Sequence, residues 1–372
     1  MHSWTERWFI RATLAIAVVG ATFMPASATS VSAESPSGLR DAITQTTTAE
    51  GAAAATPEDV PESAIPDDVT TQETEVAIKN SGNGSLGRRD VEPFQMVGVT
   101  WEADANVTGV VAEVQVRTNG KWSDWTQLAT TDVEVGRPGT DPMWLSEPAD
   151  GVAVQVTSET GTPADVQVST INPAGQTETA SANASLTTAR AEPAVYDPTS
   201  GDGGEEFAST GVSQPTIVSR AAWGAGNGLW GTSGCSAPQI SSVSKGIVLH
   251  HTAGSNTAKE SESESIIRGY QTYHVKSRGW CDIGYAFLVD RWGRIYEGRK
   301  GGITKQVTGA HAGVTSVNKD ATSISMMGNF DVAEPPAAMK DAVVRLAAWR
   351  LSLYGSNANG TYVSGGKTYK VL

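Results

Sequence analysis

Between residues 91 and 173, apolar and polar side chains alternate in short runs, as in residues 110–117. This period of two is typical of strands with one buried face, and Asn119-Gly120 between two such runs favours a tight hairpin. Helical periodicity is missing from this stretch. The pattern therefore predicts a small β-sandwich as an accessory domain over residues 91–173.

After residue 212 the pattern becomes a mixture of strand and helix. Apolar runs of strand length alternate with stretches whose apolar residues recur at helical spacing. Strands are predicted at 245–250, 285–290, 294–297 and 323–327, and helices at 261–277 and from Pro335-Pro336 to Gly355. This order predicts a second domain over residues 213–372, of the α/β class, with a mixed sheet flanked by helices. The fold class is therefore multidomain.

The remaining segments lack such patterns. The chain of 372 residues opens with Arg7 and Arg11, an apolar run at 12–24 and then small residues. That run is too short to span a bilayer, so residues 1–33 are predicted to be a cleaved signal peptide, with an uncleaved anchor as the alternative. We therefore expect a secreted protein without stable membrane insertion.

Two segments are predicted to connect the folded parts. Residues 35–89 contain no Trp, Tyr or Phe, and so few apolar side chains cannot offset the entropy of ordering. We predict a disordered tether over 34–90 and a linker over 174–212, which is rich in Thr, Ser, Ala and Gly. The two domains should then be separate folded bodies joined by a segment that moves independently.

Charge is distributed unevenly between these parts. Residues 213–372 hold 17 Lys and Arg against 10 Asp and Glu, a net charge of +7 in a chain whose total is −13. A basic domain on an acidic chain favours an anionic partner. Bacterial cell wall, with its stem-peptide carboxylates, is one such partner, whereas export argues against nucleic acid.

Tryptophans and cysteines each leave two interpretations. The four tryptophans of the predicted sandwich could stack on sugars, but tryptophans are more often core residues, which is the interpretation we prefer: Trp101, Trp122, Trp125 and Trp144. The chain has two cysteines, Cys235 and Cys281, and an oxidising compartment favours a structural disulfide between them over a thiol nucleophile.

Four of the five histidines lie in the second domain, and they are His250, His251, His274 and His311. His250 and His251 end a predicted strand, where adjacent side chains point to opposite faces. Only one of the pair can therefore serve a given site. A histidine at the end of a strand is commonly a structural residue, and metal ligation is the alternative.

Short words around these histidines occur in a fixed order. They are Trp223-Gly224-Ala225, Ile247-Val248-Leu249-His250-His251-Thr252-Ala253-Gly254, Tyr273-His274, Gly279-Trp280-Cys281-Asp282-Ile283-Gly284-Tyr285, Ile295-Tyr296-Glu297-Gly298-Arg299, Gly309-Ala310-His311-Ala312 and Gly328-Asn329-Phe330. The series resembles the peptidoglycan recognition protein and type 2 N-acetylmuramoyl-L-alanine amidase family, over roughly residues 215–372. The stretch at 91–173 is similar to the β-rich segment that precedes such domains in actinobacterial amidases.

The resemblance implies a cell-wall hydrolase that cleaves the amide between muramic acid and L-alanine of peptidoglycan. It implies a catalytic Zn²⁺ whose bound water becomes hydroxide near neutral pH, with His250 as one ligand. Tyr285 would be the catalytic residue that orients water and stabilises the oxyanion. His311 and His274 would contact the substrate, a peptidoglycan fragment or muropeptide, and His251 would face the core.

The chain departs from the family pattern in its zinc ligands. In the family, a second His and a final Cys or Asp follow a segment like residues 368–372, where this sequence stops. No histidine follows His311, and neither cysteine is placed to substitute. We therefore expect a domain truncated before its last two ligands, either part of a zinc amidase or a non-catalytic peptidoglycan-binding protein. A structural adhesin is a third interpretation.

Overall fold

The structure is a computed structural model that describes residues 69–77, 83–131, 135–173 and 212–372. The predicted signal peptide, the tether as far as residue 68 and the linker up to residue 211 lie outside these residues. In the described part, no helix is long and apolar enough to cross a membrane. The described residues belong to one compact unit, which contains two domains.

The first domain is built from strands that hydrogen bond into one antiparallel sheet. Its strands are β1 (Thr70–Glu75), β2 (Gly84–Thr100), β3 (Val111–Thr118), β4 (Lys121–Trp122), β5 (Thr126–Leu128), β6 (Thr130–Thr131), β7 (Gly139–Thr140), β8 (Met143–Thr157) and β9 (Gln167–Asn172). The order is β1-β9-β2-β8-β3-β4; β5 pairs with β3, and β7 pairs with both β2 and β6. The alternating side chains of β8, Val152, Val154 and Val156, are fully buried in its core. The β-rich fold expected here is confirmed.

The predicted boundary between tether and β domain is wrong. The tether was expected to reach residue 90, but β1 and the first part of β2 lie inside that range. β1 is an edge strand of polar residues that pairs with β9 over its whole length, so main-chain hydrogen bonds hold it. Leu86 of β2 is buried opposite Val154. The absence of aromatic residues, from which the tether was predicted, indicates neither main-chain pairing nor the burial of a single leucine.

The hairpin and tryptophan predictions can be compared with the structure directly. Asn119 and Gly120 both have positive φ, at 50° and 74°, and connect β3 to β4 as the Asn-Gly signal predicts. Trp101 and Trp144 are buried, as core residues should be. Trp122 is half-buried beneath the guanidinium groups of Arg88 and Arg117, whereas Trp125 is 40% exposed and is not a core residue.

The second domain contains a mixed five-stranded sheet in the order β10-β14-β13-β16-β12. Its strands are β10 (Ile217–Val218), β12 (Gly246–His251), β13 (Phe287–Val289), β14 (Ile295–Glu297) and β16 (Ala321–Met326). Two small pairs lie outside this sheet, β11 (Ile240–Ser241) with β15 (Gln306–Val307), and β17 (Thr361–Ser364) with β18 (Lys367–Lys370). β12, β16 and β13 are parallel neighbours, whereas β13 and β14 form an antiparallel hairpin. The mixed sheet predicted from the sequence is confirmed.

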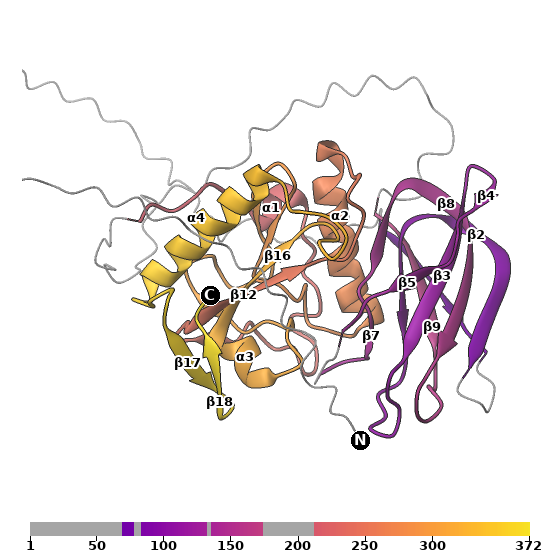
Figure 1. Cartoon of the computed structure of the whole chain (residues 1–372), viewed down its shortest axis with the longest axis horizontal. Coiled ribbons are helices and arrows are strands. Elements are labelled where there is room, and N and C mark those ends of the chain that lie inside the picture. The colour runs from indigo at the N-terminus through magenta and orange to yellow at the C-terminus, as the bar shows by residue number, and fades with distance from the viewer. Residues whose placement is uncertain (1–68, 78–82, 132–134, 174–211) are drawn as a thin grey trace, which may run out of the picture. The chain divides into compact units, whose positions relative to one another are not determined.

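Helices cover the two faces of this sheet. They are α1 (Arg220–Trp223), the 3₁₀ turn η2 (Glu260–Glu262), α2 (Ser263–Thr272), the π-helical turn η3 (Tyr273–Ser277), α3 (Thr315–Asp320) and α4 (Ala337–Leu353). Phe287 and Val289 of β13 pack in the core beneath α4, whereas Leu288 between them packs with α2 residues on the opposite face. Figure 1 shows α2 and α4 on either side of β12 and β16. The sheet is therefore buried on both faces, as its apolar strands predict.

The two domains share a third core, which the sequence did not predict. Met96, Trp144 and Ile171 of the β domain pack in one cluster with Ile267 and Tyr270 of α2. All five side chains are no more than 2% exposed. The expectation of two bodies with separate cores is therefore wrong for the described residues.

Candidate functional site

The central pair of the site consists of His250 and His311. His250 lies near the end of β12, where it pairs with Ser325 of β16. His311 lies in the loop after β15, which Asn318 of α3 holds by accepting hydrogen bonds from the main-chain N–H groups of His311 and Ala312, both at 2.8 Å. The Nε2 atom of His250 and the Nδ1 atom of His311 are 2.9 Å apart. One imidazole must therefore donate to the other, with the direction set by their tautomers.

Tyr285 and His274 complete a histidine–tyrosine cluster, which consists of His250, His274, Tyr285 and His311. The Tyr285 ring lies 5.4 Å from the ring of His250 and 5.8 Å from that of His274, between centroids. His274 comes from η3 and Tyr285 from the loop before β13. The structure therefore brings together all four residues singled out from sequence motifs.

Burial sets the protonation states of the cluster. Burial, and then the neighbouring His251, lowers the pKa of His250 to about 4. Burial also lowers the pKa of His274 and of His311 well below 6.5. The pKa of Tyr285 is raised well above 10.0 by burial and then by the carboxylate of Asp141. At neutral pH the cluster therefore holds neutral imidazoles and a protonated phenol.

The side chain of His274 is buried, unlike that of a residue at an open ligand-binding surface. Its ring is 2% exposed and lies stacked against Trp280, with centroids 4.6 Å apart, and its Nδ1 accepts a hydrogen bond from the N–H of Gly284. His311 is also buried, and among the described residues its Nε2 has no hydrogen-bond partner. Substrate contact by either histidine stays a prediction. His274 also supports the loop that carries Tyr285.

His251 does not face the core as expected. Its side chain is partly exposed, and its Nδ1 accepts a hydrogen bond from the main-chain N–H of Phe330 at 2.9 Å. The word Gly328-Asn329-Phe330 follows β16, whose last residue pairs with His251. His251 therefore anchors this neighbouring loop, on the side of β12 away from His250.

A zinc site is not complete among the described residues. They contain no group of three His, Cys, Asp or Glu side chains arranged to hold a metal ion. His250 is the position that matches a family ligand, and its pKa keeps it in the neutral form that binds metals. The residues present therefore do not fit a three-ligand catalytic zinc.

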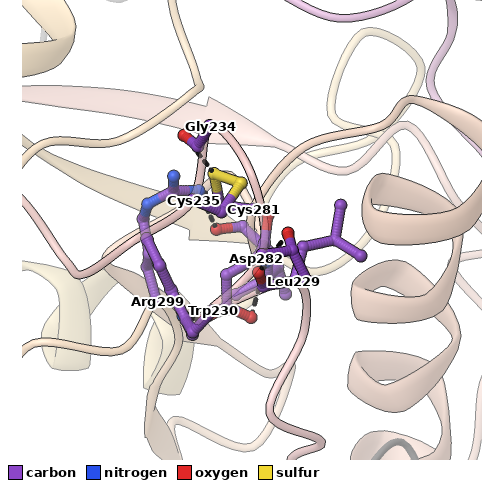
Figure 2. The surroundings of a disulfide bond; sticks show 9 residues. Leu229, Trp230, Gly234, Cys235, Cys281, Asp282 and Arg299 are labelled. Atoms are coloured by element: carbon purple, nitrogen blue, oxygen red, sulfur yellow. Dashed lines mark hydrogen bonds between the residues drawn. A yellow bond between two sulfur atoms is a disulfide. The ribbon is translucent and has the colours of Figure 1, made fainter.

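The predicted disulfide is confirmed. Cys235 and Cys281 are bonded, with Cα atoms 5.5 Å apart, and Figure 2 shows the bond beside the loop at Leu229 and Trp230. Leu229 donates its N–H to the carbonyl oxygen of Cys281 at 2.9 Å. Cys281 immediately precedes Asp282, so the disulfide fixes one end of the segment that leads to Tyr285.

Reduction of this disulfide is expected to lower the free energy of unfolding by about 2–4 kcal/mol, because the bond closes a long loop in the unfolded chain. Denaturant unfolding of the Cys235→Ser, Cys281→Ser double variant, compared with the oxidised protein, measures the difference. An unchanged midpoint of unfolding would show that the loop closure contributes nothing to stability.

Two residues that sequence reasoning did not single out lie next to the cluster. Arg278 and Trp280 precede Cys281, and both side chains are buried. Their polar atoms bond to main-chain carbonyl oxygens of the β domain. The word containing Trp280 was visible in the sequence, but nothing in it indicated these distant partners.

Both domains match known families. Residues 240–369 match the family described as N-acetylmuramoyl-L-alanine amidase, and residues 42–190 match the one described as Rv3811 N-terminal galactose-binding domain-like. The mixed sheet and the ordered motifs define a domain of the peptidoglycan recognition type. The C-terminal domain belongs to the family of peptidoglycan recognition proteins and type 2 N-acetylmuramoyl-L-alanine amidases.

Particular relatives come from animals. Peptidoglycan-recognition protein SC2 of Drosophila simulans is 37% identical over 125 residues, which are 34% of this chain and 61% of that protein. Peptidoglycan recognition protein 1 of Bos indicus is 39% identical over 133 residues, 36% of this chain and 64% of that protein. A crystal structure of human PGRP-IBETAC in complex with glycosamyl muramyl pentapeptide is 29% identical and covers 38% of this chain and 79% of its own, with a TM-score of 0.33. The chain spans about three fifths of the length of these curated relatives.

Proposed function

We propose that this chain is an exported protein that binds peptidoglycan fragments through the histidine–tyrosine cluster. The observation that carries the proposal is the convergence of His250, Tyr285 and His311 within a domain of the peptidoglycan recognition family. The basic charge of residues 213–372 suits an anionic cell-wall ligand. Export is supported by the predicted signal peptide at 1–33 and by the disulfide.

The protonation states suit recognition of an amide-rich ligand. A phenol with a raised pKa stays protonated, so Tyr285 donates a hydrogen bond to a carbonyl oxygen of the ligand. Because neutral His250 and His311 bond to each other, the pair keeps one ring N–H donor and one ring-nitrogen acceptor, which match the C=O and N–H groups of a stem peptide. The Nε2 of His311 is a buried polar atom without a partner in the part of the chain that the structure describes, and a ligand group would supply the missing hydrogen bond.

Binding can be measured by calorimetry with a soluble disaccharide pentapeptide muropeptide. His250→Ala and Tyr285→Phe should each weaken binding about 5- to 150-fold, because each removes a hydrogen bond worth about 1–3 kcal/mol. His251→Ala is the matched control, since the side chain of His251, next to His250 in the sequence, bonds to the loop at Phe330 instead. Equal effects of His250→Ala and His251→Ala would contradict a ligand role for the cluster.

Zinc-dependent hydrolysis of the N-acetylmuramoyl–L-alanine amide is the second candidate function. The match of His250 and Tyr285 to the family's ligand and catalytic tyrosine favours it, and zinc would supply an activated water when bound. In that reaction Tyr285 would donate to the developing oxyanion, as a protonated phenol can.

The 372-residue chain is expected to retain less than one equivalent of zinc after dialysis, because a single family ligand supplies too little affinity. It should also release no stem peptides from purified peptidoglycan. Metal analysis and mass spectrometry of the soluble products check both expectations. If the chain retains zinc tightly and also cleaves the amide, it is an amidase, and further residues must then ligate the metal.

A further inference from the structure

The β6–β7 hairpin of the β domain contacts the second domain at a buried arginine, Arg278. Arg278 is 1% exposed, and its main-chain carbonyl oxygen accepts a hydrogen bond from the N–H of Arg137 at 2.9 Å. Its guanidinium donates to the carbonyl oxygens of three hairpin residues, Arg137 at 2.7 Å, Thr140 at 3.1 Å and Thr131 at 3.3 Å. A planar fork of donors is suited to such a set of carbonyl acceptors.

Trp280 continues the same contact. Its indole N–H donates to the carbonyl oxygen of Val135 at 2.9 Å, and the Arg278 guanidinium lies 4.8 Å from the centre of its ring. Gly136 has a φ of 82°, and a Cβ there would lie 2.7 Å from the Trp280 ring. Glycine at this position therefore permits both the turn of the chain and the close approach of the indole.

Trp280 links this contact to the histidine–tyrosine cluster. Its ring stacks on His274 at an interplanar angle of 27°, and its main-chain N–H donates to the carbonyl oxygen of His274 at 2.8 Å. The His274 Nδ1 in turn accepts from the N–H of Gly284, the residue before Tyr285. A Cβ on Gly284 would lie 2.8 Å from the Trp280 ring, so indole, imidazole and loop are closely packed.

We propose that the described residues of the β6–β7 hairpin support the ligand site from the β domain, and that Arg278 and Trp280, held by this hairpin, are positioning residues that orient His274 and Tyr285. The inference rests on the proposed function for the identity of the ligand. Each step of the path is a direct contact between neighbours, from Val135 to Trp280, then to His274 and to Gly284. The accessory domain then has a role in muropeptide binding without touching the ligand.

A contact that only stabilises the fold would change different measured quantities from a contact that positions the site. Loss of a purely stabilising contact lowers the melting temperature but leaves the ligand affinity of the folded protein unchanged. Loss of positioning frees the Gly284 amide and weakens ligand binding at temperatures where the protein is fully folded. The two roles are therefore separable by measuring affinity, amide exchange and melting on the same variants.

The experiment uses the full chain with Trp280→Phe, Trp280→Ala, Arg278→Lys and Ser146→Ala. Phenylalanine keeps the stacking on His274 and loses the bond to Val135, whereas alanine loses both. Ser146→Ala is the matched control, because Ser146 contacts Ser255 and Thr257 across the same domain boundary, outside the path through Trp280. Calorimetry with the disaccharide pentapeptide gives the dissociation constant, and hydrogen exchange followed by mass spectrometry covers the peptide around Gly284.

We expect Trp280→Phe and Arg278→Lys to weaken binding about 5-fold and Trp280→Ala at least about 10-fold, with faster exchange at Gly284. Ser146→Ala should change neither. Affinity and Gly284 exchange equal to wild type in Trp280→Phe and Arg278→Lys would overturn the proposal, whatever the melting temperatures. If the wild-type chain binds no muropeptide, the proposed function fails, and exchange at Gly284 still decides whether the hairpin positions the loop.

Discussion

Replacement of Asp282 by asparagine is expected to lower the free energy of unfolding by about 3–5 kcal/mol. Asp282 is fully buried and forms an ion pair with Arg220 at 3.0 Å, whose side chain is 8% exposed. Arg299, also buried, donates to the carbonyl oxygens of Asp282 and Ile283. Removing the carboxylate charge deprives two buried guanidinium groups of the anion that Asp282 supplies.

Asparagine cannot replace the hydrogen bonds either. One carboxylate oxygen of Asp282 accepts from Gln271 Nε2 at 2.7 Å and from the N–H of Ile283 at 2.8 Å. The other accepts from the N–H of Lys300 at 2.9 Å and from Trp230 Nε1 at 3.5 Å, a contact drawn in Figure 2. Every neighbour is a donor, so an amide nitrogen would face another donor whichever way it turned.

Denaturant unfolding of Asp282→Asn and of Asp341→Asn gives the comparison. Asp341 pairs with Arg345 one turn later on the exposed face of α4, where such pairs contribute at most about 0.5 kcal/mol. Losses of similar size in the two variants would show that the buried network is not the stronger one. Loss of muropeptide binding in Asp282→Asn would follow from disorder of the segment ahead of Tyr285.

The elements of both domains were predictable where one face of a strand or helix is buried. The valines of β8 alternate because every second side chain enters the core. Pro335-Pro336 precede α4 because a missing N–H costs nothing at the start of a helix, and Gly355 follows it because glycine readily adopts the positive φ that ends a helix. β1 was missed because its polar residues are held by main-chain pairing with β9, which leaves no side-chain pattern. The shared core was missed because apolar residues such as Met96 and Ile267 give the same sequence pattern whether their own domain or the other domain buries them.

The members of the candidate site were predictable from motif words, whereas their roles were less so. His250 lies near the end of β12, Tyr285 just before β13 and His311 in the loop that Asn318 holds, so the order of the motifs was enough to place them together. His274 was expected beside a ligand, but Trp280 covers it. That arrangement depends on carbonyl oxygens of Val135 and Thr140, and a carbonyl group leaves no trace in a sequence.

The free energy of unfolding is expected to fall steeply as the pH is lowered from about 6.5 toward 4. Burial holds the pKa of His250 at about 4 and the pKa of His274 and His311 well below 6.5, so the unfolded chain binds protons that the folded chain does not. Stability is therefore fully present above the unfolded pKa and is lost as the pH falls. Each such histidine contributes up to about 1.4 kcal/mol per pH unit, and three together about 4.

The identity of the groups can be checked with His274→Asn, whose side-chain oxygen can replace the Nδ1 acceptor for Gly284 without titrating. This variant should lose about 1.4 kcal/mol per pH unit of the slope between pH 6.5 and 4.5. Arg278 and Arg299 are the cations that lower the pKa of His274 further, whereas the raised pKa of Asp141 opposes the slope at the acidic end. Leu346→Ala, which removes a buried side chain that does not titrate, should lower stability equally at each pH. An unchanged slope in His274→Asn would mean that burial does not keep His274 neutral, because the protons taken up on unfolding must then bind to other groups.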